Sequence, residues 1–250
     1  MAPIKILSWN IQSRDGLEGN KLADKQFTKT LNDHDIFCLQ ECRKEVKIPN
    51  YVCYNKLRPN HKGGGVCIGF ARYLMGGIQK YDTKSRRDIL AITLDSDFFG
   101  FRRNVILISC YIPPINSPGM KQTNGDPFDD LLDLLEEVDN KYDVILCGDF
   151  NSRTQTTTDV SLCDSIPGIE NVDPTTENNT DSELVTINLS RNNKDANKNS
   201  YTEGFFDMIS QGNLFIVNGR TLGDIFGDYT CINYNGASTV DYFLLSKTIS

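Results

Sequence analysis

At 250 residues, the chain is long enough to bury the core of one large α/β domain, and a hydrophobic fraction of 39% argues against a disordered protein. The formal net charge of −7 excludes nucleic-acid binding through a uniformly basic surface, although a local basic patch remains compatible with it. No apolar run approaches the length of a membrane span, and the first residues, MAPIKILSWN, lack the apolar core of a signal peptide. We therefore expect an intracellular protein, nuclear or cytoplasmic, without a membrane partner.

The eight cysteines do not show the spacing of a disulfide framework. No C-x-x-C pair exists, and the chain has only two histidines, which argues against a structural zinc site. Free cysteine inside an apolar run behaves as a small buried hydrophobe. The cysteines that we expect to be buried and reduced for this reason are Cys38, Cys67, Cys110 and Cys147.

Short apolar runs rich in isoleucine, valine, leucine and phenylalanine recur along the chain and predict β-strands. In chain order, these predicted strands cover residues 4–9, 36–39, 65–70, 89–94, 105–111, 144–147, 214–217 and 240–245. No strong helical pattern separates GGGVCIGF from VILISCYIPP. This spacing favours antiparallel pairing in places over a strictly parallel sheet.

Helical patterns lie between some of these strands. The stretch DPFDDLLDLLEEVDNKY has Asp126 as its expected N-cap, Pro127 at the first helical position, and leucines at helical spacing. Weaker helical patterns are LADKQFTKTL and TEGFFDMISQG. Strands and helices in this mixed order predict a layered α/β fold. The asparagine-rich stretch 170–200 is expected to be a polar surface loop or an insertion.

Carboxylate, amide and phenol side chains recur at the ends of the predicted strands. A single polar residue at such a place is most often a turn former. The same pattern at several strand ends indicates a site, because rigid strands deliver side chains to one rim. These candidate residues are Asn10, Glu41, Tyr111, Asp149, Asn151 and Asp241.

The motifs that carry these residues resemble successive signatures of the endonuclease/exonuclease/phosphatase superfamily. They are LSWNIQS, CLQECR, SCYIPP, LCGDFNSR and VDYFLLS, and the resemblance extends from residue 4 to residue 246. The superfamily includes DNase I, the apurinic/apyrimidinic endonucleases and the endonuclease domains of non-long-terminal-repeat retrotransposons. The stretch after GDFNSRT is most similar to the retrotransposon endonucleases.

The resemblance implies a single domain over residues 1–250 with a DNase I-like α/β fold, a four-layer α/β/β/α sandwich of two mixed sheets. It implies a metal-dependent phosphodiesterase that nicks DNA by contacts to the phosphate backbone. A retroelement origin further implies a reverse transcriptase fused in the parent protein.

The resemblance also assigns roles to residues. Glu41 would hold the divalent cation with Asn10 near it; Mg²⁺ fits because it needs few protein carboxylates, and Mn²⁺ is compatible. Asp149 would orient or deprotonate the attacking water, and Asn151 would fix that water or the phosphate. Tyr111 would place its hydroxyl against the scissile phosphate, where charge develops in the transition state. The residues implied to bind substrate are Arg153, Thr230 and Ser238.

In the family, the aspartate that matches Asp241 pairs with the histidine of a Ser-Asp-His triplet, in a later segment that also holds the final core strand. The chain ends at Ser250, before such a segment. We therefore expect a fold that lacks its last strand and turnover reduced by about 10²–10⁴-fold. We also expect an apolar sheet edge that is open to self-association.

Other parts of the sequence have ordinary structural explanations. Trp9 is expected in the core and not as a base-stacking platform. The glycines at 63–65 are expected to form a tight turn into a strand, since no helix with Lys-Ser/Thr follows them as in a phosphate-binding loop. Basic residues at 84–87 and 102–103 are expected to be solvated, unless the fold brings them beside the metal, where they would contact a DNA backbone.

Two alternative functions remain open at this point. One is a phosphatase or sphingomyelinase-type phosphodiesterase of the same fold, although the sequence contains no lipid-recognition motif. The other is an inactive binding protein or remnant that keeps the fold without turnover. Metal binding without nicking would select the second alternative.

Overall fold

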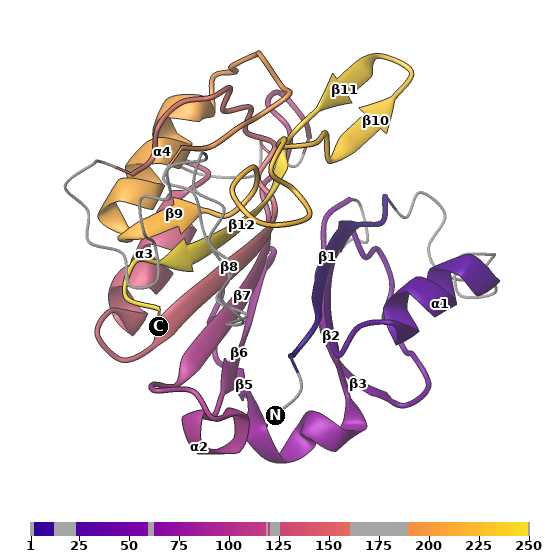
Figure 1. Cartoon of the computed structure of the whole chain (residues 1–250). Helices are drawn as coiled ribbons and strands as arrows, with labels where there is room; N and C mark the ends of the chain where they lie inside the picture. Colours follow the sequence, from indigo (N-terminus) through magenta and orange to yellow (C-terminus); the bar gives the residue numbers. More distant parts are fainter. Residues whose placement is uncertain are drawn as a thin grey trace, which may run out of the picture.

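Two mixed β-sheets face each other in the computed structural model, which describes residues 3–12, 24–59, 63–118, 120, 126–160 and 190–249 (Figure 1). The first sheet contains, in spatial order, β1 (Ile6–Asn10), β2 (Ile36–Gln40), β4 (Val66–Ala71) and β3 (Tyr51–Lys56). The second contains β5 (Ile78–Tyr81), β6 (Ile89–Leu94), β7 (Val105–Tyr111), β8 (Asp143–Asp149), β12 (Asp241–Ser246) and β9 (Leu214–Ile216). A separate hairpin, β10 (Cys231–Asn233) with β11 (Gly236–Ser238), projects past the start of β12.

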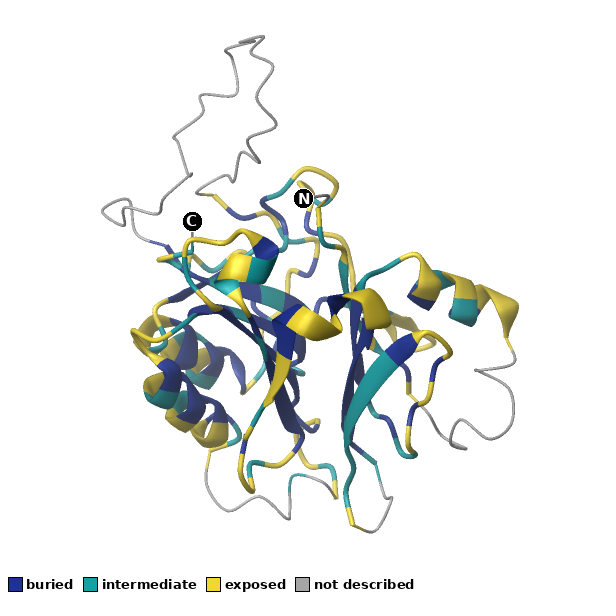
Figure 2. Ribbon diagram, turned by 90° about the horizontal axis from the view of Figure 1, so that it is seen from below, coloured by how far each residue is buried: buried dark blue, intermediate teal, exposed yellow. Residues whose placement is uncertain are grey.

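Apolar side chains on the facing sides of the two sheets form the central core. Figure 2 shows the buried residues gathered in the strands. Every residue of β2, β4 and β7 is buried, which is why these strands read as continuous apolar runs. Residues that meet between the sheets include Ile36, Cys38, Ile68, Leu90, Leu107 and Cys147.

Helices cover the outer face of each sheet. Helix α1 (Lys25–Asn32) packs Phe27 and Leu31 on the outside of the first sheet. On the outside of the second sheet lie α3 (Asp129–Val138) and α4 (Thr202–Gln211), which bury leucines and phenylalanines against β7, β8 and β12. The short α2 (Ser96–Phe99) and the 3₁₀ helix η1 (Arg72–Gly77) connect strands. The four-layer α/β/β/α arrangement expected from the sequence is therefore confirmed.

Mixed pairing is also confirmed. The pairs β1–β2 and β7–β8 are parallel, and the other pairs within the two sheets are antiparallel. The cysteines expected to be buried, at 38, 67, 110 and 147, are all buried.

The sequence missed the edge strands β3 and β5 and the separate hairpin, whereas the edge strands β1 and β9 were predicted. Strands β3 and β5 are the outermost strands of their sheets, and the hairpin β10–β11 stands alone. An edge strand has polar residues such as those in IQKY, because part of it faces water. Such a strand lacks the continuous apolar run on which the prediction depended.

The first turn of α3 also differs from the prediction. The helix begins at Asp129, and Asp126 is not its N-cap. Instead, the Asp126 carboxylate accepts the backbone N–H of Phe128 at 2.8 Å, and its own N–H donates to Asp129 at 3.0 Å. Asp126 and Pro127 thus form a turn before the helix.

The polar stretch predicted as a surface loop at 170–200 lies partly outside the described residues. In its last part, from residue 190, Arg191 and Asp195 are buried, and the backbone of Lys198 forms an isolated antiparallel β-bridge with Thr154. Most other residues of this part are exposed and lie outside helices and strands, and the expectation of a surface loop or an insertion stays a prediction. The described residues include no helix with the length and hydrophobicity that a membrane span requires.

Candidate active site

The candidate residues meet at one rim of the two sheets because of strand direction. Strands β7 and β8 run parallel and place Tyr111 opposite Asp149 at their ends. Strand β12 runs the other way and begins there, with Asp241 opposite Asp149. From the facing sheet, the ends of β1 and β2 deliver Asn10 and Glu41 to the same place. The predicted convergence of strand ends therefore occurs.

Asn10 connects the two carboxylates that the sequence singled out. Its Nδ2 donates to Oε1 of Glu41 at 2.9 Å and to Oδ2 of Asp149 at 2.7 Å. Its Oδ1 accepts the backbone N–H of Gln12 at 2.9 Å, which fixes the orientation of the amide. Asn10 is therefore a bridge across the two sheets.

The turns that carry Glu41 and Asn151 have unusual backbone geometry. Both residues have positive φ, at 56° and 48°, a region that side-chain-bearing residues seldom adopt. Asn151 donates its backbone N–H to Oδ1 of Asp149 at 2.8 Å and its Nδ2 to the carbonyl of Ile112 at 2.8 Å. Strained backbone of this kind persists where the surrounding structure holds it, often at functional sites.

Asp149 is almost completely buried, at 4% exposure. Burial raises its pKa well above the usual value, and the charge of Asp241 adds to the effect; hydrogen bonds from Asn10 and Asn151 oppose it. A raised pKa makes the Asp149 carboxylate a stronger base, which favours acceptance of a proton from water.

Asp241 has an oxygen without a partner. Its Oδ1 is buried and makes no hydrogen bond. Burial raises the pKa of Asp241 to about 6, a hydrogen bond with Thr230 opposes this, and the charge of Glu41 adds to it. The Oγ1 of Thr230 accepts the backbone N–H groups of Val240 and Asp241, each at 3.1 Å. An unpaired buried acceptor is costly, which makes this oxygen a candidate for contact with a ligand or a proton donor.

Tyr111 lies beneath the rim and is 7% exposed. Burial raises the pKa of its hydroxyl strongly, the carboxylates of Glu41 and Asp149 raise it further, and the cation of Arg58 opposes them. The phenol therefore stays protonated and is a hydrogen-bond donor.

A cavity of about 520 Å³ opens above these groups. It is lined by strand-end residues and by the hairpin segment that follows Thr230. The lining residues include Asn10, Glu41, Asp149, Asn151, Asn218, Thr230, Cys231, Ile232, Asn233 and Asp241. Of the predicted substrate-binding residues, Thr230 thus lies at the cavity.

The other two predicted substrate-binding residues do not line the cavity. Arg153 donates through Nε and Nη2 to the two oxygens of Asp195, at 2.8 and 2.6 Å. This ion pair anchors the segment after residue 190. Ser238 lies in β11, where its carbonyl accepts the N–H of Thr230 at 3.1 Å. Substrate contacts by Arg153 and Ser238 stay predictions.

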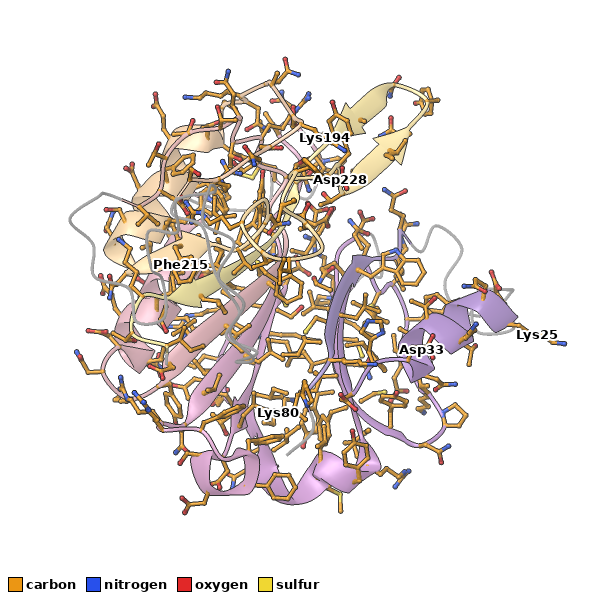
Figure 3. All side chains as sticks on the ribbon, in the orientation of Figure 1. Lys25, Asp33, Lys80, Lys194, Phe215 and Asp228 are labelled. Atoms are coloured by element: carbon orange, nitrogen blue, oxygen red, sulfur yellow. The ribbon has the colours of Figure 1, made fainter. Side chains whose placement is uncertain are left out.

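The basic clusters pair with acidic residues of the second sheet and its helices. Lys84 and Arg86 both donate to Glu137 of α3, and Arg103 pairs with Asp143. Lys194, in the segment after residue 190, pairs with Asp228 below the hairpin (Figure 3). None of these basic residues lines the cavity, so they are not brought beside the carboxylates.

Trp9 differs from its predicted place in the core. Its ring packs against Phe27 of α1, with centroids 5.2 Å apart, but 37% of the residue is exposed. The reason is that β1 is an edge strand, so its side chains have neighbours on one side only.

Sequence reasoning missed Asn218, which lines the cavity next to Asp241. Its Oδ1 accepts the N–H of Phe243 at 2.9 Å, and its Nδ2 donates to the carbonyl of Asp241 at 3.3 Å. It directly follows the apolar run LFIV, so the same strand-end signal was present in the sequence.

The donor set fits a hard divalent cation. Glu41 and the unpaired Oδ1 of Asp241 offer carboxylate oxygens in one cavity, whereas the Oδ1 of Asn10 accepts the N–H of Gln12. Among the described residues, no group of three or more His, Cys, Asp or Glu side chains is arranged to hold a metal. Carboxylate oxygens are ligands for hard divalent cations.

The chain matches the sequence model of the endonuclease/exonuclease/phosphatase family over residues 7–249. The comparison with curated proteins gave no match. Among solved structures, it is similar to an AP endonuclease from Leishmania major, with a TM-score of 0.63, 13% identity, and coverage of 97% of this chain and 79% of that one.

Two further solved structures share the fold. The endonuclease domain of TRAS1, a telomere-specific non-LTR retrotransposon, has a TM-score of 0.56 and 15% identity, with 97% of this chain and 84% of that one covered. A 3′ phosphatase from Neisseria, bound to a product DNA hairpin, has a TM-score of 0.57 and 18% identity, with 98% and 87% covered. At these identities, the likeness concerns the fold.

Proposed function

Because this chain belongs to the endonuclease/exonuclease/phosphatase family, we propose that it is a Mg²⁺-dependent phosphodiesterase that nicks DNA. The observation that carries the proposal is the Asn10 amide, which joins Glu41 and Asp149 in a cavity that also contains Asp241. Three carboxylates that repel one another in a half-buried cavity need a cation to balance them. Phosphodiester hydrolysis uses such a cation as a Lewis acid and as a template for the phosphate.

Each residue has a role in this scheme. Glu41 would hold the cation, as Mg²⁺ or Mn²⁺, and Asn10 lies beside it and donates its Nδ2 to Glu41. Asp149, with its raised pKa, accepts a proton from the attacking water, and Asn151 keeps the Asp149 carboxylate in place. Tyr111 donates its hydroxyl to a phosphate oxygen as charge develops there.

The substrate and the origin of the domain are also part of the proposal. Thr230 and the hairpin residues at the cavity rim are suited to contact the DNA backbone, with Arg153 and Ser238 behind them. The order of the sequence motifs and the fold shared with the TRAS1 endonuclease domain support a retroelement origin. This origin predicts that the transcript encodes reverse-transcriptase motifs beyond codon 250, and sequencing that region tests it.

One observation favours a second candidate function, that of a binding protein with little turnover. In the part of the chain that the structure describes, the buried Oδ1 of Asp241 has no hydrogen-bond partner, so it is open to a bound ligand. The assay that separates the two candidates is conversion of supercoiled plasmid to nicked circles in Mg²⁺. Metal binding without any nicking would overturn the proposed activity and select the binding function.

Metal binding is tested without activity by thermal unfolding. A ligand that binds only the folded state raises the free energy of unfolding of the protein by about 2.7 kcal/mol when the ligand is present at 100 times its Kd. We therefore expect Mg²⁺ and Mn²⁺ to raise Tm in the wild type and not in Glu41→Gln. The control is Glu45→Gln, which changes an exposed glutamate in the same loop that pairs with Lys47. An equal rise of Tm in Glu41→Gln would contradict the assignment of Glu41.

We also propose self-association through β1. No strand pairs with the outer edge of β1 within the described residues. An open edge with an exposed Trp9 is a template for pairing with another chain. We expect dimers or larger species in light scattering, and more monomer for Trp9→Lys than for Tyr73→Lys, a change at an exposed aromatic in η1. A monomer at high protein concentration would contradict this proposal.

A further inference from the structure

An arginine–aspartate pair lies behind Tyr111, outside the residues that line the cavity. Asp88, which precedes β6 and is 3% exposed, accepts Nε of Arg58 at 2.8 Å and also its Nη2. The Arg58 side chain is 10% exposed, and its Cζ lies 5.8 Å from the centroid of the Tyr111 ring. A guanidinium over an aromatic face is attracted to it, more strongly where water is excluded. The cation is thus fixed against the Tyr111 ring.

Asp88 also joins the two sheets at the rim of the site. Its backbone carbonyl accepts the N–H of Tyr111 at 3.0 Å, and its Oδ1 accepts the N–H of Gly65 at 2.7 Å. The carbonyl of Gly65 in turn accepts the N–H of Cys42, the residue after Glu41, at 3.0 Å. One buried aspartate therefore connects the backbone of Tyr111 to the turn that carries Glu41.

The glycines before β4 make room for the guanidinium. A Cβ at Gly64, whose φ of +64° lies in the left-handed range, would lie 2.3 Å from Nε of Arg58. No side chain fits there while Arg58 stays on Asp88. The glycine run that the sequence indicated as a tight turn therefore also determines where Arg58 lies.

We propose that Arg58, locked by Asp88, is a positioning residue that holds the ring of Tyr111 in place for hydrogen bonding to the scissile phosphate. The inference rests on the proposed function, in which Tyr111 contacts the phosphate. Nε and Nη2 of Arg58 both donate to Asp88, and the Arg58 side chain is nearly buried, so it does not reach the substrate itself. It acts through the ring, and its loss affects the transition state and not the binding of DNA.

The first test is steady-state nicking by Arg58→Gln. We expect kcat per folded molecule to fall about tenfold, with KM unchanged, since a desolvated cation–π contact contributes about that factor. Arg58→Lys keeps a cation and should recover part of the loss. The matched control is Arg103→Gln, which removes an arginine from a different buried aspartate, Asp143. Unchanged kcat in Arg58→Gln, or an equal loss in Arg103→Gln, would overturn the inference.

A double-mutant cycle tests whether Arg58 acts through Tyr111. If it does, Arg58→Gln combined with Tyr111→Phe should be no slower than Tyr111→Phe alone, because the ring no longer has a hydroxyl to position. Independent, multiplying losses would show that Arg58 acts by another route.

Gly64→Ala displaces Arg58 without removing it, which covers the case in which Arg58→Gln folds poorly. Gly100→Ala is its control, because Gly100 has a similar φ of +74° but open space around its Cβ position. Both variants carry the same backbone cost, and only Gly64→Ala should lower kcat. Equal kcat for the two would count against the inference.

A readout without activity separates this inference from the proposed function. In protein labelled with 3-fluorotyrosine, the ¹⁹F resonance of Tyr111 is identified by its loss in Tyr111→Phe. Arg58→Gln should shift this resonance, and Arg103→Gln should leave it in place. If the wild type does not nick DNA, the proposed function fails, and the ¹⁹F shift still decides whether Arg58 positions the ring. An unshifted resonance overturns the inference whatever the activity.

Discussion

Asp149→Asn is expected to reduce plasmid nicking at least about a hundredfold, because the amide cannot accept the proton of the attacking water. The substitution keeps the size of the side chain. It also replaces a buried carboxyl whose pKa is raised by burial and by Asp241, so the fold should tolerate it. Nicking is measured on supercoiled plasmid in Mg²⁺, at equal concentrations of folded protein.

The matched control for Asp149→Asn is Asp143→Asn. Asp143 is buried at the opposite end of β8, where it pairs with Arg103 and accepts a hydrogen bond from Thr248 at 3.1 Å. This control should lose stability and keep its kcat. Nicking by Asp149→Asn at the wild-type rate would remove Asp149 from the mechanism.

Asp241→Asn is expected to make the metal-free protein more stable at neutral pH and less active in Mg²⁺. The pKa of Asp241 is raised to about 6 by burial, against about 4 in an unfolded chain. Because the folded state holds the proton of Asp241 more tightly than the unfolded chain, protonation of this group stabilises the fold. This stabilisation is fully present below about pH 4 and is lost as the pH rises through about 6. At pH 7.5 the ionised carboxylate therefore destabilises the fold, on the order of 2–3 kcal/mol.

The measurement for Asp241→Asn is Tm as a function of pH. The Tm of Asp241→Asn should exceed that of the wild type by roughly 5 °C or more at pH 7.5. This difference should shrink at pH 5 and vanish near pH 4. Mg²⁺ should reduce the gain at pH 7.5, because a bound cation balances the carboxylates of the wild type. Asp207→Asn, a change on the exposed face of α4, is the control and should show no such pattern. A pH-independent gain would exclude charge repulsion as its cause.

Much of the fold follows from local pattern. The strands that are buried on both faces, such as β2, β4 and β7, have continuous apolar sequences, and the sequence predicted them within one or two residues. The edge strands β3 and β5 were missed, because their residues are mostly half-buried or exposed and do not form a continuous apolar run. The start of α3 was misplaced because Asp126 forms a turn that competes with a helix cap.

The sequence alone determined which residues form the candidate site. Polar residues that directly follow apolar strands, with Asn10, Glu41 and Asp149 in the order of the family motifs, identified the residues that meet at the rim. Only the tertiary structure decided how they interact. Asn10 and Asp149 are 139 residues apart, and their hydrogen bond depends on how one sheet is placed on the other. The same packing leaves Oδ1 of Asp241 without a partner and brings Arg58 to Tyr111, because burial and distance between sheets are not properties of any local stretch of sequence.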